Sequence, residues 1–231
     1  MAKLARDIVN KCKYISEKKI ELVEQLVHDL KRRQFQDDHE DLDDDSANVE
    51  VSMDRVDDYM EQLYGGDDDM QDKIKGSASI LKLCCNVANL EVLIQNLQLM
   101  SALSRVLSDD YKRSSELSFN LCRVFLAFSN FMEMHSILSN YRVGAMTMKV
   151  VELELKRSLH RAEERAKAAE EGGVSNHRAD EKEGILSRRQ DKLIFVALHL
   201  LINLAEDVNV EKKMIKKNLV EILTQSLNRR T

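Results

Sequence analysis

The chain contains no proline and no tryptophan, and it has only seven glycines among its 231 residues. Proline and glycine interrupt helices more than other residues do, so a chain poor in both can form long helices. Aromatic residues make up only 5% of the sequence. This composition suits an array of helices better than a β-sandwich or a barrel. We therefore expect an all-α protein.

Features of several functional classes are also missing. No apolar run approaches the length of a membrane span, and the first residues lack the apolar segment of a signal peptide. The net charge is −5, which leaves no excess of cations for binding nucleic acid. The four cysteines form no CxxC pair, as in many reduced intracellular proteins. We expect a soluble, cytosolic chain that binds neither nucleic acid nor the membrane interior.

Catalytic and metal-binding motifs are absent as well. The sequence has no GxGxxG, GxxxxGK[ST] or GxSxG pattern, so it lacks phosphate-binding loops and nucleophile elbows. Its histidines form no HxxxH or HExxH pattern, and Cys84 and Cys85 would point about 100° apart on a helix. The acidic runs at 37–45 and 67–69 do not match an EF-hand loop. We expect no enzyme activity, no metal site and no cofactor.

Apolar periodicity and charge divide the chain into segments. Dense like charges repel and leave little to bury, so the acidic run indicates a linker. Lys, Arg, Glu and Ala dominate one later stretch, which is either a protruding helical hairpin or a loosely ordered insertion. We expect an N-terminal helical segment at 1–36, an acidic linker at 37–51, helical repeats at 52–155, a charged insertion at 156–190 and a further helical repeat at 191–231.

Within residues 52–155, the apolar residues indicate several helices. A short helix is expected at about 52–64, ended by Gly65-Gly66. The apolar residues from Leu90 to Leu107 read as one continuous stripe of helical periodicity. Ser108-Asp109-Asp110 is expected to break this stripe before the next helix.

Three similar segments recur along the chain. Each begins at an apolar residue that we call its anchor, and the anchors are Leu83, Phe128 and Leu204. The first two anchors are 45 residues apart, and removal of the charged insertion brings the second interval to a similar length. Repeats of this length built from two or three helices indicate an armadillo or HEAT solenoid. Stacked repeats share a continuous core and leave a long groove that binds extended peptides or helices.

Several blocks of the sequence can be compared with known families. They are Lys19–Arg33, Met53–Tyr64, Asp72–Ala78, Ile80–Asp110, Tyr141–Ala145, Glu154–Arg157 and Val196–Asp207. In this order they resemble the kinesin-associated protein family, the armadillo-repeat non-motor accessory subunit of heterotrimeric kinesin-II. Family members are several times longer, so the resemblance is to a short or truncated form.

The resemblance implies a fold and a function. The fold would be an armadillo-type α-solenoid, a right-handed superhelix of about three repeats with a charged helical insertion. The protein would be a non-catalytic adaptor that binds the tails of the kinesin-II motor subunits and links them to cargo proteins. It would act in microtubule-based, intraflagellar transport, in the cytoplasm and at the cytoskeleton and cilium.

The resemblance also points to residues of the groove, which the last helix of each armadillo repeat lines. An asparagine before Leu-Ala in such helices hydrogen-bonds a bound peptide, and here this residue is Asn203. His199 lies one turn earlier on the same face. In the preceding repeat, Asn120 and Arg123 hold comparable helical positions. Each of these four residues is a candidate partner contact, with ordinary surface or capping roles as the alternative.

Two other functions remain open. An armadillo cargo receptor of another kind, importin-like or catenin-like, would use groove tryptophans or a strongly basic groove, and this chain has no tryptophan. A structural coiled-coil protein would need sustained heptads, which Gly65-Gly66 and Gly172-Gly173 interrupt. The apolar surface expected after Leu227 indicates either a continuation or self-association.

Overall fold

The computed structural model describes residues 50–65, 70–170 and 177–228, and also residues 6, 19–23 and 25–26. The chain divides into two compact units, Met1–Glu50 and Val51–Thr231. In the first unit, residues 20–23 are helical, and Val23 is buried. The expected acidic linker falls almost entirely outside the described residues. The fold described below is that of the second unit.

All elements in the described part of the second unit are helices, which confirms the all-α expectation for these residues. None of them is long and apolar enough to cross a membrane. Their order is η3 (Met53–Arg55), α3 (Val56–Leu63), α4 (Met70–Cys84), α5 (Val87–Gln95), α6 (Leu97–Asp110), α7 (Ser115–Ser129), α8 (Met132–Asn140), α9 (Val143–Glu170), α10 (His177–Ala205), α11 (Val208–Ile215) and α12 (Leu219–Leu227).

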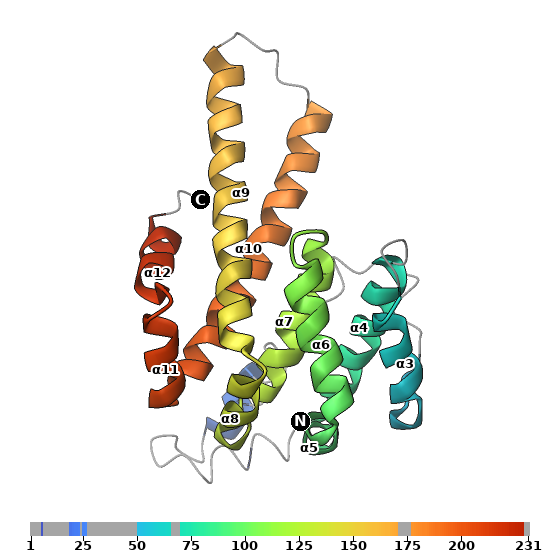
Figure 1. The fold of residues 1–231 in the computed structure, drawn as a ribbon. Helices are drawn as coiled ribbons and strands as arrows, with labels where there is room; N and C mark the ends of the chain where they lie inside the picture. The colour runs from blue at the N-terminus through green and yellow to red at the C-terminus, as the bar shows by residue number, and fades with distance from the viewer. Residues whose placement is uncertain are drawn as a thin grey trace. The chain divides into compact units, whose positions relative to one another are not determined.

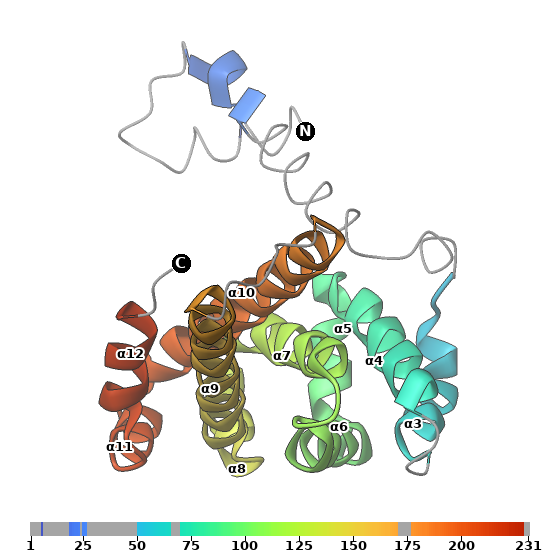
Figure 2. The ribbon, with the colours of Figure 1, turned by 90° about the horizontal axis from the view of Figure 1, so that it is seen from above.

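These helices form two layers, which Figure 2 shows from above. One layer consists of α4, α7 and α10, with α7 packed between the other two. The second layer consists of α3, α6, α9 and α12, and each helix packs against the next. The short helices α5, α8 and α11 connect the first layer to the second (Figure 1). A short helix followed by a longer one therefore recurs after each anchor.

Local sequence explains where the short helices begin. The side chain of Asn86 accepts a hydrogen bond from the backbone N–H of Ala88 and caps α5. Asp207 accepts from two backbone N–H groups and caps α11 in the same way. Asn and Asp are favoured caps because their oxygens satisfy the free N–H groups of the first helical turn. Both caps lie three residues after an anchor, so the sequence repeat is also a structural repeat.

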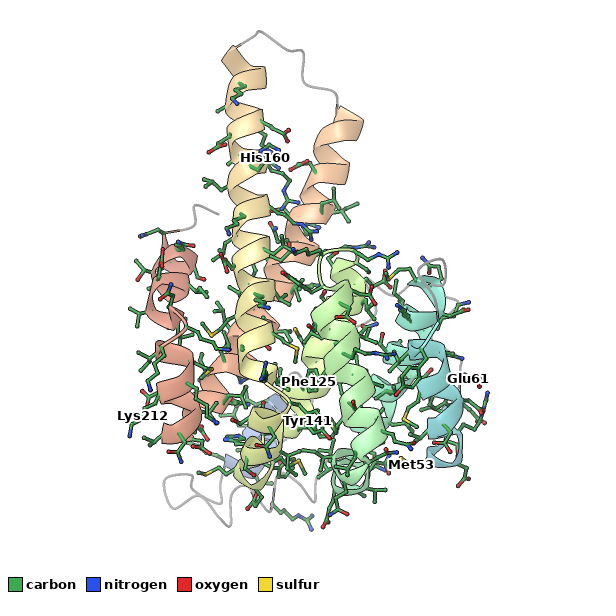
Figure 3. The ribbon with its side chains drawn as sticks, viewed as in Figure 1. Met53, Glu61, Phe125, Tyr141, His160 and Lys212 are labelled. Atoms are coloured by element: carbon green, nitrogen blue, oxygen red, sulfur yellow. The ribbon has the colours of Figure 1, made fainter. Side chains whose placement is uncertain are left out.

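The hydrophobic core lies between the two layers. The anchors Leu83, Phe128 and Leu204 are all buried in it, together with Phe125. Figure 3 shows Phe125 among the packed helices, whereas Glu61 and Lys212 point outward. Fully burying a large apolar side chain stabilises a fold by about 1.5–3 kcal/mol. The anchors therefore recur because each one joins a repeat to the shared core.

Polar and glycine residues fix the position of α4 against its neighbours. The Nζ atom of Lys73 donates to Asp110 at 2.8 Å, and both side chains are buried. A buried ion pair whose partners satisfy each other constrains packing strongly, because removal of either partner leaves an uncompensated charge. Gly76 faces α3, where an added Cβ would lie 2.8 Å from the carbonyl oxygen of Tyr59. The ion pair of Lys73 and the close approach of Gly76 to α3 thus both fix the position of α4.

Two expectations about helix boundaries are wrong. The break expected at Ser108-Asp109-Asp110 does not occur there, because α6 continues through Asp110, which Lys73 and Arg113 hold by ion pairs. The continuous stripe from Leu90 to Leu107 is two helices. Asn96 ends α5, and its side chain accepts from the N–H of Leu99 to start α6.

The charged stretch at 156–190 is helical in its described parts, as one of the two alternatives expected. Residues 156–170 continue α9, and residues 177–190 begin α10. These two helical stretches extend beyond the ends of α6 and α7 (Figure 1). At their base, Gln190 donates to the carboxylate of buried Glu154 at 2.8 Å. Further out, Arg165 pairs with Glu183 at 2.8 Å.

Candidate partner-binding face

The residues expected to contact a partner lie on α7 and α10, in the layer formed by α4, α7 and α10. The anchors lie near the C-terminal ends of these three helices, so a position can be compared between helices by its distance from the anchor. Two candidate residues hold equivalent positions when they lie the same number of residues before their anchors.

Asn203 connects α10 to the end of α7. Its Nδ2 atom donates to Ser129 Oγ at 3.1 Å and to Asn130 Oδ1 at 3.0 Å. The side chain is half-buried at the edge of the layer. Asn203 therefore has a structural role in aligning two neighbouring helices, and it also lies where a partner can reach it.

Asn120 makes the same kind of bond but lies deeper. Its Nδ2 atom donates to Ser77 Oγ at 3.1 Å, and only 6% of the residue is exposed. Asn120 lies eight residues before its anchor, whereas Asn203 lies one residue before its own. The two positions are therefore not equivalent, and the amide of Asn120 is used between α4 and α7.

Arg123 and His199 are equivalent, because each lies five residues before its anchor. Each also pairs with an aromatic ring one turn earlier. The guanidinium of Arg123 lies 5.6 Å from the ring centroid of Phe119, a cation–π arrangement. His199 meets Phe195 edge-on, with the ring centroids 6.2 Å apart. We call these two pairs the aromatic pairs of α7 and α10.

Two apolar residues of this surface, both on α10, were not recognised from the sequence. Phe195 is 70% exposed and Ile202 is 62% exposed, although both belong to a strongly apolar run of α10. The signal was present, because residues 193–204 are apolar on every side of the helix and carry no charge. A helix that is apolar all round has more surface to cover than one neighbouring layer can cover.

The central stretches of these three helices carry more cations than carboxylates, and Glu116, Asp191 and Glu206 border them. Within residues 72–83, 117–128 and 193–204, the acidic side chain is Asp72, which pairs with Lys75 at 3.6 Å. Lys73 is buried against Asp110. Lys82 and Arg123 are the other charged side chains of these stretches, and both are half-buried cations. We call the surface formed on α7 and α10 by the two aromatic pairs, Ile202 and Asn203 the open face.

No group of three or more His, Cys, Asp or Glu side chains gathers to hold a metal ion in the described part of the chain. Burial raises the pKa of the Cys84 and Cys122 thiols to about 12, so both stay protonated near neutral pH. Thiolates are the nucleophilic and metal-binding form, and these two cysteines therefore serve as core residues.

Comparison with known proteins identifies one family. A family model described as kinesin-associated protein (KAP) matches residues 1–231. The match includes the charged residues 156–190 and the acidic run, which the resemblance noted from the sequence left out. No solved structure matches the chain.

Proposed function

Because the chain belongs to the kinesin-associated protein family, we propose that it is a scaffold subunit of heterotrimeric kinesin-II. Family membership gives the chain a kinesin-associated accessory role. The more specific proposal is that it binds the tails of the two motor subunits and links them to cargo proteins. It would do so without catalysis, in microtubule-based transport in the cytoplasm, at the cytoskeleton and in the cilium.

We infer that the helices are the repeats of an armadillo-type right-handed solenoid. The recurring order of short and long helices supports this inference, as do the two layers and the equivalent caps Asn86 and Asp207. In such arrays each repeat contacts mainly its neighbours, and the stacked helices present an extended binding surface. The bonds from Asn120 to Ser77 and from Asn203 to Ser129 would keep the successive helices aligned.

The observation that carries the binding role is the open face on α7 and α10. Phe195 and Ile202 are largely exposed there, on the same helix as His199, and Arg123 lies on the neighbouring helix α7. Exposed aromatic and arginine side chains are typical anchors of protein interfaces. This face therefore supports a role in holding another polypeptide.

Co-purification with the motor subunits tests the proposed function. The chain would be co-expressed with tagged tails of both kinesin-II motor subunits, and we expect all three to elute together after affinity and size-exclusion chromatography. The matched control uses motor subunits that end before their tails, and these should leave the chain unbound. A folded chain that ignores both tails, alone and together, would falsify the motor role.

A further inference from the structure

We propose that two copies of this chain pair through the uncovered side of α10, with their α10 helices antiparallel about a two-fold axis. The contact residues on each copy form a set that we call the α10 stripe, and they are Phe195, Leu198, Ile202 and Ala205. This pairing goes beyond the proposed binding of motor tails. It is carried by the coverage of the equivalent positions on α4 and α7, by the spacing of the stripe and by its lack of charge.

The positions of the α10 stripe are covered on the two preceding helices of the same layer. Counted from the anchors, the equivalent residues are Ile74, Ser77, Leu81 and Cys84 on α4, and Phe119, Cys122, Leu126 and Ser129 on α7. None of these side chains is exposed, because α7 packs on α4 and α10 packs on α7. The bonds from Asn120 to Ser77 and from Asn203 to Ser129 confirm that these positions face the next helix. On α10, in contrast, Phe195 and Ile202 are largely exposed.

The chemistry of the α10 stripe differs from that of its equivalents. On α4 and α7, a serine accepts a hydrogen bond from an asparagine of the next helix. On α10, Leu198 stands at the position of Ser77, and Ala205 stands at the position of Ser129. The stripe therefore offers no side-chain acceptor to a covering helix, and it suits a surface that is as apolar as itself.

The spacing of the stripe makes it complementary to its own copy. Its residues are separated by three, four and three positions, which is the spacing of the a and d positions of a coiled coil. In an antiparallel pair, Phe195 faces Ala205 of the second copy, and Leu198 faces Ile202 of the second copy. A large side chain against a small one, next to two of similar size, fills both levels of the contact evenly. A two-fold axis repeats each of these contacts.

The absence of charge allows the stripe to meet itself. A two-fold contact brings groups close to their own copies, and like charges that face each other are unfavourable. Residues 193–204 contain no Lys, Arg, Asp or Glu. Asp191 and Lys192 lie just before this stretch, and Glu206 lies just after it. A parallel pair would set each of these groups against its own copy, whereas an antiparallel pair sets Glu206 beside the end with both signs of charge.

The second layer ends in an uncovered apolar surface as well. Figure 2 shows α10 and α12 at the end of the two layers that lies away from α3 and α4. Val220, Leu223 and Leu227 of α12 are exposed, with the same spacing of three and four positions. Their equivalents on α6, which are Met100, Leu103 and Leu107, are buried. An axis perpendicular to the layers would bring the two copies of α12 together beside the α10 pair, so both layers would continue across the dimer.

Pairing of two copies has a consequence for the open face. Phe195, His199 and Ile202 belong to that face, so a second copy and a partner polypeptide would exclude each other there. Motor tails that bind the open face should therefore convert dimers into single chains bound to tails. The pairing itself does not depend on this competition.

Sedimentation velocity of the intact chain, over a range of concentrations, tests the pairing. We expect a monomer–dimer equilibrium with a Kd of about 1–100 µM, as is usual for small interfaces. Because the contact is apolar, a rise from 0.1 M to about 0.5 M salt should change this Kd less than about twofold. The mass of one chain throughout this concentration range overturns the inference. Dimers that dissociate at the higher salt overturn it as well, because charge would then hold them together.

Charge changes at His199 test the antiparallel arrangement. His199 is exposed beside the stripe, near the middle of the paired region, so an antiparallel pair brings it close to His199 of the second copy. His199→Asp and His199→Lys should each weaken pairing about tenfold, because two like charges meet. An equal mixture of the two variants should pair at least as tightly as the unchanged chain, since Asp then meets Lys. A mixture that pairs as weakly as the separate variants overturns the antiparallel arrangement.

The matched control for these changes is Val92, which is 60% exposed on α5. Val92→Asp and Val92→Lys should leave the Kd unchanged. Phe195→Ala should weaken pairing about tenfold through lost apolar contact, whereas Val92→Ala should not. Equal effects at Phe195 and Val92 would overturn the assignment to α10. All of these measurements use this chain alone, so failure of the motor tails to co-purify concerns only the proposed function.

Discussion

At the scale of single residues, Gly76 shows how one position can fix the contact between two helices. A Cβ atom at this position would lie 2.8 Å from the backbone oxygen of Tyr59 and 2.9 Å from Cβ of Gln62. Backbone atoms cannot rotate away as a flexible side chain can. The glycine therefore allows α3 and α4 to approach each other closely, even though glycine is unfavourable inside a helix.

We predict that Gly76→Ala lowers the free energy of unfolding by about 1–3 kcal/mol, because overpacking outweighs the better helix propensity of alanine. Gly184→Ala is the matched control. Gly184 also lies inside a helix, but an added Cβ would meet nothing within 4 Å. This control should raise the stability by about 0.5–1 kcal/mol. Urea unfolding midpoints with unchanged slopes measure both effects. Stabilisation by both changes would contradict the close approach of α3 and α4.

At the scale of elements, the layer of α4, α7 and α10 is aligned by side chains that bond across it. Asn120 on α7 donates to Ser77 on α4, and Asn203 on α10 donates to Ser129 on α7. In each case the serine lies two positions further along the equivalent helix than the asparagine. Buried amides need partners, so these bonds favour one register over neighbouring ones.

A double-mutant cycle should measure the first of these bonds. We predict that Ser77→Ala and Asn120→Ala are coupled by about 0.5–1.5 kcal/mol in their effect on the free energy of unfolding, the usual net contribution of one hydrogen bond. The control cycle combines Ser77→Ala with Thr224→Ala. Thr224 bonds the carbonyl of Val220 within α12, so these two changes should be additive. Additivity in both cycles would show that the bond contributes nothing to stability.

At the scale of the whole second unit, the repeats differ in how well they are covered. Leu103 and Leu107 of α6 are buried, as is Val151 of α9. The corresponding residues of α12 are Leu223 and Leu227, which are 38% and 86% exposed. In the described chain, α7 packs on α6 and α10 packs on α9, whereas α12 packs mainly against α9 and α11. The same sequence pattern thus produces a covered helix twice and a partly uncovered helix once.

We predict a gradient of local stability from this difference in coverage. Backbone amides of α12 should exchange with deuterium at least about tenfold faster than those of α7, because helices with few buried contacts open more readily. Hydrogen exchange followed by mass spectrometry, with intrinsic rates measured in denaturant, tests this. Equal protection across α7 and α12 would indicate that the unit opens only as a whole.

The sequence by itself determined the helical class, the recurrence of the anchors and the family resemblance. Local rules suffice for these features, because apolar spacing, caps and scarce glycine act within a few turns of chain. The cap at Asn96 is a local signal that the apolar pattern did not reveal, whereas the ion pair of Asp110 with Lys73 joins residues far apart in the sequence.

Only the tertiary structure decided which surfaces stay open. Periodicity shows which residues share a helix face, but it does not show what packs against that face. Asn120 and Asn203 looked comparable along the chain, yet α4 buries the first, and the second lies at the edge of the layer. Phe195 lies in a strongly apolar run, yet it is exposed because no described helix covers that side of α10. The arrangement of neighbouring helices, which depends on contacts far apart in sequence, made these choices.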